Sequence, residues 1–165
     1  MYIYSIAVDG GRASVINMMT RSFGVFKRIL LAYDGSQHAK RALEVAVDLA
    51  KKYGARLYIV EVIDTATAFW GPGTHVPFDV IESMRRKAEA DIAEAKARAE
   101  SEGIQVEPAI LEGDPAVVVV EYADREGVDL IVAGSRGLST MKRVLLGSVS
   151  TGIVTHAKRP VLIVK

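Results

Sequence analysis

The sequence contains no cysteine and only three histidines, and these shortages exclude several kinds of chemistry. Without cysteine the chain has no disulfide framework, no thiolate nucleophile and no thiolate-based zinc site. His38, His75 and His156 lie far apart along the chain and form no spaced set of metal ligands. We therefore expect no resident metal site and no cysteine-based catalysis.

Long apolar runs and a dominant charge are also missing. No segment approaches the roughly 20 apolar residues that a membrane-spanning helix needs, and no basic region precedes the short apolar run at the N-terminus. The 21 lysines and arginines are interspersed with 20 acidic residues, for a formal net charge of +1. This balance offers no electrostatic surface for nucleic acid or a membrane, so we predict neither as a partner and expect a cytoplasmic protein.

The chain does have a regular alternation of apolar strands and amphipathic helices. Its 165 residues, half of them hydrophobic, suit one domain with a substantial core. Continuous apolar runs predict buried strands at 29–33, 56–62, 106–111, 130–133 and 161–164. Helical spacing and end signals predict helices at about 39–53, 77–102, 115–126 and 148–157. This alternation predicts an α/β domain with a doubly wound parallel sheet.

One of these helices is predicted against its local composition. Val117–Val120 is a run of four β-branched residues, which favours a strand. Asp114 and Pro115, however, provide an N-cap and a proline at the first helical position. Parallel strands also need a crossover between them, so we expect a helix here.

A glycine-punctuated segment follows the strand predicted at 130–133. Two residues separate Gly134 from Gly137, and nine more precede Gly147, which Ser148 follows. Such glycines are also typical of strand ends and turns. Because glycine has no Cβ, however, backbone N–H groups in the loop can close around an anion, and the next helix would add its unpaired N–H groups. The position after a buried strand, at the ligand-binding edge of open α/β sheets, favours an anion site.

The spacing Gly134-x2-Gly137-x9-Gly147-Ser148 resembles the ATP-binding signature of the universal stress protein family, in its nucleotide-binding branch. The likeness extends over about residues 27–165, through the segments KRILLAYDGS, VIDT, DPAVVVVEYADREGVDLIVAGS and RPVLIVK. It implies a single five-stranded parallel sheet in the order 3-2-1-4-5, similar to adenine-nucleotide alpha-hydrolases. The pattern is neither a Walker A loop nor a dinucleotide fingerprint.

The resemblance also implies where an adenine nucleotide would lie. Asp34 and the backbone of Ala32 would face the nucleoside, and Val62 would lie against adenine. Phosphate contacts would fall on Gly134, Ser135, Arg136, Gly137, Gly147, Ser148, Val149 and Ser150. Mg²⁺ or Mn²⁺ would be carried by the phosphates of ATP rather than by a protein cage. From the residues alone, Asp34 has an alternative role as the cap of the helix that follows it.

Together these features predict an ATP-binding regulatory module with at most slow hydrolysis, because no general base is evident near the glycine loop. An ATP-consuming transferase or hydrolase of a related fold is one alternative, but its His-x-Gly-His and Lys-Met-Ser-Lys-Ser motifs are missing. A phospho-acceptor receiver domain needs an acidic pair after the first strand, where only Asp34 stands. A family member that no longer binds nucleotide is disfavoured by the intact glycines.

Three further expectations concern the periphery. The apolar strand Val161–Val164 is an unprotected sheet edge in the implied order and predicts a homodimer. Residues 1–26 form an extension outside the domain at 27–165, with a hairpin or a flexible segment as alternatives. The role of Phe69 and Trp70, in a loop rich in glycine and proline, stays open between a lid, an interface and simple cover.

Overall fold

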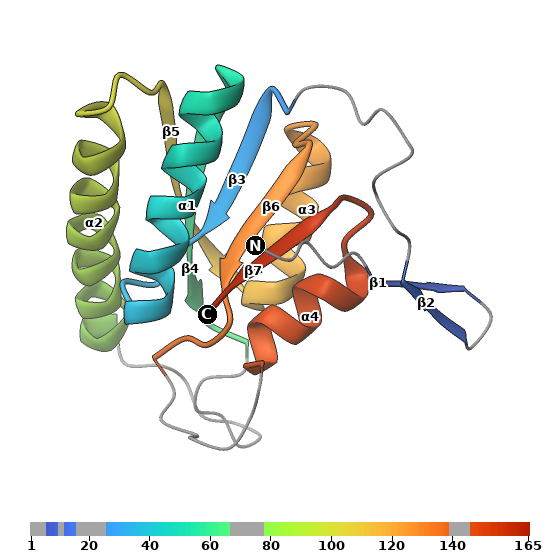
Figure 1. The fold of residues 1–165 in the computed structure, drawn as a ribbon. Coiled ribbons are helices and arrows are strands. Elements are labelled where there is room, and N and C mark those ends of the chain that lie inside the picture. Colours follow the sequence, from blue (N-terminus) through green and yellow to red (C-terminus); the bar gives the residue numbers. More distant parts are fainter. Residues whose placement is uncertain (1–5, 10–11, 16–25, 67–77, 139–145) are drawn as a thin grey trace.

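The computed structural model describes residues 6–9, 12–15, 26–66, 78–138 and 146–165 (Figure 1). Five parallel strands form one sheet in the spatial order β5-β4-β3-β6-β7. In chain order they are β3 (Arg28–Ala32), β4 (Arg56–Asp64), β5 (Val106–Gly113), β6 (Leu130–Gly134) and β7 (Val161–Val164). Counted along the chain this order is 3-2-1-4-5, so the predicted topology is confirmed.

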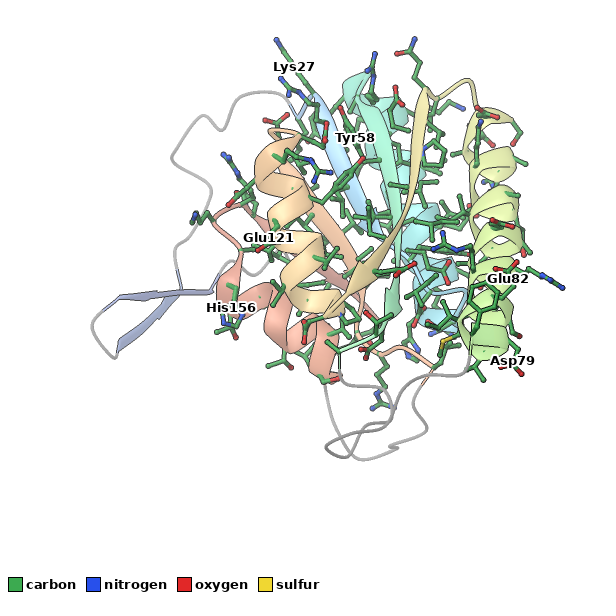
Figure 2. The ribbon with its side chains drawn as sticks, turned by 180° about the vertical axis from the view of Figure 1, so that it is seen from behind. Lys27, Tyr58, Asp79, Glu82, Glu121 and His156 are labelled. Carbon is green, nitrogen blue, oxygen red and sulfur yellow. The ribbon has the colours of Figure 1, made fainter. Side chains whose placement is uncertain are left out.

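Helices cover both faces of the sheet. They are α1 (Gln37–Tyr53) and α2 (Phe78–Glu100) on one face, with α3 (Pro115–Arg125) and α4 (Ser148–His156) on the other. Alternate residues of each strand supply two separate cores: Ile29 and Leu31 pack on the α1 side, whereas Leu30 packs on the α3 side. Charged side chains such as Asp79 and Glu121 occupy the outer surfaces of the helices (Figure 2). The doubly wound arrangement is therefore confirmed.

Capping explains why the chain turns into helices where it does. The Ser36 hydroxyl accepts a hydrogen bond from the Ala39 N–H at 3.1 Å and so caps α1, which ends at Gly54 with a φ of 61°. The Asp114 carboxylate accepts from the N–H groups of Ala116 and Val117, at 2.9 and 3.0 Å. This cap and the burial of α3 against the sheet override the strand preference of its valines, as predicted.

Two strands are longer than their apolar runs predict. β4 and β5 pair with each other as far as Asp64 and Gly113, two residues beyond the predicted ends of both strands. Of the four added residues, Asp64 and Glu112 are charged, Gly113 has no side chain and Ile63 is buried, and their backbone pairing depends on the neighbouring strand rather than on a continuous apolar run. This extension matters for the site, because it carries β4 past the end of β3.

The N-terminal extension contains two strands, β1 (Ile6–Asp9) and β2 (Arg12–Val15), which pair antiparallel. This pairing agrees with the hairpin interpretation, although its turn at Gly10-Gly11 lies outside the described residues. The loop that holds Phe69 and Trp70 lies outside them as well. Within the described part, no helix is long and apolar enough to cross a membrane.

Candidate functional site

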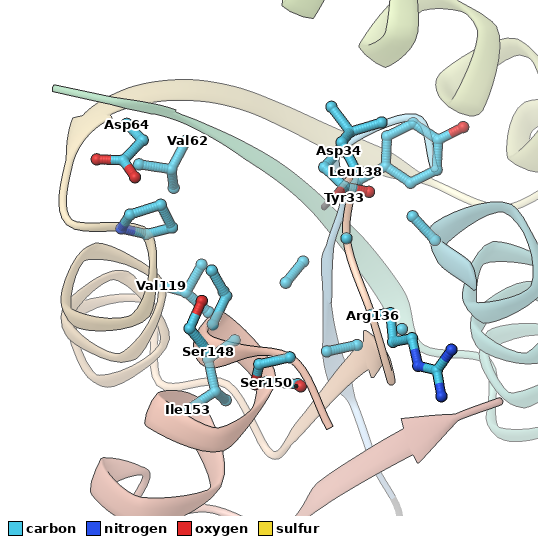
Figure 3. Close-up of a pocket in the computed structure, with 18 of the residues that line it drawn as sticks. Tyr33, Asp34, Val62, Asp64, Val119, Arg136, Leu138, Ser148, Ser150 and Ile153 are labelled. Carbon is cyan, nitrogen blue, oxygen red and sulfur yellow. Dashed lines mark hydrogen bonds between the residues drawn. The ribbon is translucent and has the colours of Figure 1, made fainter. Parts of the chain in front are cut away.

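A pocket of about 410 Å³ opens at the carboxyl ends of β3, β4 and β6, beside the start of α4 (Figure 3). The chain leaves β3 and β6 toward opposite faces of the sheet, so this is the topological switch point where open α/β sheets bind ligands. Ten of the eleven predicted site residues line the pocket: Ala32, Asp34, Val62, Gly134, Arg136, Gly137, Gly147, Ser148, Val149 and Ser150. The structure thus brings together segments that are more than 100 residues apart in the sequence.

Ser135 is the predicted site residue that does not line the pocket. It is 2% exposed, and its carbonyl oxygen accepts hydrogen bonds from the Gly147 N–H at 2.8 Å and the Ser150 hydroxyl at 3.1 Å. Its own N–H donates to the carbonyl of Val164 on β7. Ser135 therefore joins the two glycine segments to each other and to the sheet.

The two hydroxyls of the helix start have different surroundings. The Ser150 hydroxyl is buried and donates to main-chain oxygens, with the Gly147 carbonyl at 3.0 Å. Ser148 is exposed, lines the pocket and has no hydrogen-bond partner for its side chain in the described part of the chain. Of the two, Ser148 is the hydroxyl that a ligand can reach without disturbing the loop.

The three glycines of the signature differ in what a side chain at each position would contact. A Cβ on Gly134 would lie 2.8 Å from the carbonyl carbon of His38 and 2.9 Å from the N atom of Ala39, so close packing against α1 requires glycine. A Cβ on Gly137 would lie 2.6 Å from the Asp34 carboxylate. Among the described residues, a Cβ on Gly147 would have nothing nearer than 3.6 Å, and its φ of −72° is ordinary. The described part of the fold therefore does not demand glycine at 147.

The N-terminus of α4 differs from those of α1 and α3. Gly147 is its N-cap residue and makes no side-chain cap, whereas Ser36 and Asp114 cap the other two. The first N–H groups of a helix have no partner within the helix. Because Ser148 and Val149 line the pocket, the positive end of the α4 dipole lies at its wall. This arrangement suits an anion.

Asp34 does not cap α1, since Ser36 does. The Asp34 carboxylate instead accepts the Ser36 N–H through Oδ1, at 3.0 Å, and its Oδ2 is directed at Gly137. The Ser36 hydroxyl also lies 3.4 Å from the carbonyl oxygen of Arg136. The turn after β3 and the loop after β6 are thus in direct contact, with one carboxylate between them.

The far end of the pocket is formed by β4. β3 pairs with β4 only as far as Val60, while β4 continues to Asp64 alongside β5. The side of β4 that faces β3 therefore borders the pocket beyond Val60, and its main chain can offer hydrogen bonds there. Val62 and Asp64 both line the pocket because alternate strand residues share a face.

Sequence reasoning missed several of the lining residues. The family resemblance placed Val62 at the site, and a strand extended by two residues would have added Asp64, because alternate strand residues share a face. Pro115 and Val119 of α3 and Ile153 of α4 add apolar wall, and the sequence pattern of their helices did not assign them to the site. In the described residues, no group of three acidic, histidine or cysteine side chains is placed to hold a metal ion.

A cluster of charged groups lies behind Asp34, on the α2 side of the sheet. Lys87 of α2 binds Asp91, lies 3.4 Å from the Asp34 carbonyl oxygen and is 4.0 Å from the Glu61 carboxylate. Burial raises the pKa of Glu61 to about 7, with a further contribution from the negative charge of Asp91. Burial, together with the surrounding carboxylates, raises the pKa of Tyr33 to about 12.

Known proteins are similar to this chain in sequence and in fold. The sequence model of the universal stress protein family matches residues 26–165. A universal stress protein of Methanocaldococcus jannaschii is 32% identical over 153 residues, which cover 92% of this chain and 89% of that protein. One from Thermus aquaticus is 40% identical over 141 residues, covering 86% of this chain and all of that protein.

Solved structures agree with the sequence comparison. Universal stress protein UspA from Lactobacillus plantarum superposes with a TM-score of 0.72 at 26% identity, covering 86% of this chain and 99% of that one. A universal stress protein in complex with cAMP superposes with a TM-score of 0.65 at 29% identity, covering 86% of this chain and 98% of that one. The universal stress protein from Archaeoglobus fulgidus in complex with dAMP superposes with a TM-score of 0.63 at 25% identity, covering 86% of this chain and all of that one. Family model, sequence relatives and fold coincide over the same part of the chain, which belongs to the universal stress protein family.

Proposed function

We propose that this chain binds ATP in the pocket between β3, β6 and the start of α4, and that it acts as a regulatory nucleotide-binding module. Structural relatives bind adenine nucleotides, cAMP in one case and dAMP in another. The pocket volume of about 410 Å³ falls in the range of about 300–1,000 Å³ that is usual for small-molecule sites. One end of the pocket is apolar and the other offers N–H donors and a positive charge, which matches the base and the phosphates of a nucleotide.

The observation that carries the proposal is the α4 N-terminus, which has no side-chain cap and begins at a glycine that the fold does not require. An uncapped helix start leaves N–H donors for an external acceptor. A residue without Cβ at 147 lets the oxygens of a phosphate approach those donors closely. Both features favour an anionic group at this wall of the pocket.

The opposite end suits a base. Val62, Val119 and Ile153 supply apolar surface, and the main chain of β4 beyond Val60 offers donors and acceptors for an adenine ring. Asp34 lies between the two ends, where its carboxylate is placed to accept from a ribose hydroxyl. Arg136 adds a positive charge at the phosphate end, and it has no salt bridge among the described residues.

We expect any hydrolysis to be slow. Phosphoryl transfer requires cations and a group that positions the nucleophile, arranged around the terminal phosphate. The carboxylate that lies against the described part of the glycine loop is that of Asp34, and its Oδ1 is already held by the Ser36 N–H. Mg²⁺ would enter with the phosphates, which it binds through oxygen ligands and its own waters.

The test begins with the purified protein, which is denatured so that any released nucleotide can be identified. Nucleotide-free protein is then titrated calorimetrically with Mg-ATP, and ADP, AMP, cAMP, dAMP and GTP serve as competitors. We expect ATP to bind and GTP to compete poorly. Absence of both heat and a thermal shift with ATP would refute the proposal, and turnover approaching about 1–10³ per second would replace the regulatory module with an enzyme.

A further inference from the structure

Glu61 is a buried carboxylate next to the pocket that the nucleotide site itself does not use. It lies on β4 between Val60 and Val62, which line the pocket, but its side chain points to the opposite face, toward α2. Glu61 is only 7% exposed, and its Oε2 has no hydrogen-bond partner among the described residues. An ionised carboxylate with an unsatisfied buried oxygen is costly, so this position favours the protonated form.

Lys87 connects Glu61 to the nucleotide pocket. Its ammonium binds Asp91 one turn along α2, lies 3.4 Å from the carbonyl oxygen of Asp34, and is 4.0 Å from Glu61 Oε1. The distance to Glu61 is too long for a hydrogen bond, so Lys87 attracts that carboxylate without satisfying it. The same ammonium therefore interacts with Glu61 and with the turn that places the Asp34 carboxylate.

The turn after β3 is packed tightly against these α2 residues. A Cβ on Gly35 would lie 2.5 Å from Asp91 Oδ2, so the turn fits beneath α2 only with glycine there. On its other side, Asp34 Oδ2 faces Gly137 of the phosphate-end loop. A continuous set of contacts thus runs from Glu61 through Lys87 and Asp91 to Asp34.

The charges around Glu61 are unbalanced toward negative. β3 contributes Tyr33 and Asp34, and α2 contributes Lys87 and Asp91. Farther out, Lys40 of α1 is neutralised by Glu94 at 2.9 Å, and Glu112 of β5 is paired with Arg85. When Glu61 is ionised, one ammonium therefore faces three carboxylates.

We propose that Glu61 is a proton-linked positioning residue for the nucleotide site, which takes up a proton when an anionic nucleotide binds in the pocket that Asp34 lines. This inference rests on the proposed function. A bound phosphate adds negative charge to a region that already has an excess, and protonation of Glu61 removes one of these charges. When Glu61 is protonated, the Lys87 ammonium interacts only with Asp91 and the Asp34 carbonyl oxygen, and these contacts fix the turn after β3. Binding should therefore be tighter at low pH.

The sign of this effect is fixed by linkage. Burial and Asp91 raise the pKa of Glu61 to about 7 in the free protein, so the proton is exchanged near neutral pH. An anionic ligand raises that pKa further, because it disfavours the ionised form. We expect the dissociation constant for ATP to rise about three- to tenfold between about pH 6 and about pH 8 in the parent protein.

The experiment compares this pH profile in the parent and in Glu61→Gln by calorimetric titration with Mg-ATP. The terminal phosphate of ATP also titrates in this range, but it contributes equally to both proteins, so their difference isolates Glu61. Glu61→Gln should bind at high pH about as tightly as the parent does at low pH. Glu112→Gln is the matched control: it removes an exposed carboxylate that also pairs with α2 and should keep the parent's profile.

Lys87→Met provides a second test should Glu61→Gln fail to fold. Without the ammonium, the charged groups near Glu61 are carboxylates, which raise its pKa further. The pH at which ATP affinity changes should therefore be higher in Lys87→Met than in the parent. A pH dependence that is the same in the parent and Glu61→Gln, or an unmoved transition in Lys87→Met, would overturn the proton linkage while leaving nucleotide binding intact. Absence of ATP binding to the parent at both pH values would refute the proposed function and this inference with it.

Discussion

A Cβ atom on Gly137 would lie 2.6 Å from Oδ2 of Asp34, so the loop after β6 meets the end of β3 through a contact that only glycine allows. In Gly137→Ala the short Asp34 side chain must rotate away and release the Ser36 N–H. We expect about tenfold weaker nucleotide binding and a loss of about 1 kcal/mol or less in the free energy of unfolding. Titration calorimetry and urea denaturation measure the two effects.

Gly134→Ala provides the contrast. There the added methyl would meet the main chain of His38 and Ala39 at 2.8 and 2.9 Å, and backbone cannot rotate aside as a carboxylate can. The free energy of unfolding should fall by about 1–3 kcal/mol. Equal destabilisation by the two alanines would show that the Asp34 contact is no softer than the packing against α1.

Gly147→Val should separate binding from folding. A Cβ at 147 has room in the fold, and the extended backbone there, with φ of −72° and ψ of 169°, suits a β-branched residue. The free energy of unfolding should change by about 1 kcal/mol or less. ATP binding should be lost, because the side chain occupies the space where phosphates would approach the α4 N–H groups. Unchanged affinity would show that the phosphates lie elsewhere.

Ser148→Ala is the milder companion of that variant. It removes an exposed hydroxyl and leaves the Ser135 and Ser150 hydrogen bonds in place. A lost hydrogen bond to a charged group corresponds to about 1.5–3 kcal/mol of binding free energy. Calorimetry should therefore record an affinity about ten- to a hundredfold lower, with the melting temperature of the free protein preserved.

Glu61 should also make stability depend on pH. Its folded-state pKa of about 7 lies above the ordinary value of 4.5, mainly because of burial, so the folded state holds the proton more tightly. The stability that this group contributes is complete below about pH 4.5 and is lost as the pH rises through about 7. Glu61→Gln, which cannot ionise, should exceed the parent by about 2–3 kcal/mol at about pH 8 and by little at about pH 4. A difference that does not vary with pH would contradict this reasoning.

The homodimer prediction concerns the two edges of the sheet. The β5 edge carries Pro108 and an exposed Glu107, features that discourage pairing with another chain. β7 lacks both, and the backbone groups of its successive residues alternate in direction. The carbonyls of Pro160 and Val164 accept hydrogen bonds from the N–H groups of Ile131 and Ser135, so Val161 and Ile163 direct their polar groups outward. We expect a dimer at micromolar concentration, formed by antiparallel pairing of two β7 strands.

Ile163→Pro tests that interface. It removes an outward N–H, and a proline is tolerated at such a position of an edge strand. Sedimentation should detect a weakened dimer in a chain that still folds. Leu162→Pro is the contrasting variant, because its N–H faces β6 and its loss should lower the free energy of unfolding instead. A monomeric parent, or a dimer that Ile163→Pro leaves intact, would place the interface elsewhere.

Local signals were sufficient for most of the fold. Buried parallel strands are apolar on both faces, and the Asp114 cap directly precedes its helix. The cap of α1 is Ser36 rather than Asp34, which the sequence also offered for that role. The strand order itself came from family resemblance, because alternation predicts a parallel sheet without fixing the order of its strands. The last residues of β4 and β5 were missed because they pair through backbone and because the charged Asp64 and Glu112 interrupt the apolar runs.

The sequence predicted which positions would lie at the pocket better than it predicted what each residue does there. The glycine spacing identified a loop that borders the pocket, and Ser135 and Ser150 hold the ends of this loop together through hydrogen bonds that depend on the folded geometry. Glu61 lies in a strand whose neighbouring residues Val60 and Val62 are apolar. No local sequence feature indicates its partner Lys87, which is 26 positions away on α2. Contacts of that kind depend on how the layers pack.

The hydrogen bonds that converge on the Ser135 carbonyl have a consequence for the evolution and engineering of this chain. They fasten Gly147 and Ser150 to the end of β6, so the intervening segment closes a ring whose ends are fixed by the fold. The closure entropy of such a ring grows only slowly, by about 0.6 kcal/mol for each doubling of its length. Because the Ser135 carbonyl fixes Gly147 and Ser150, a peptide tag or reporter inserted between Leu138 and Leu146 should leave both rims of the pocket in register.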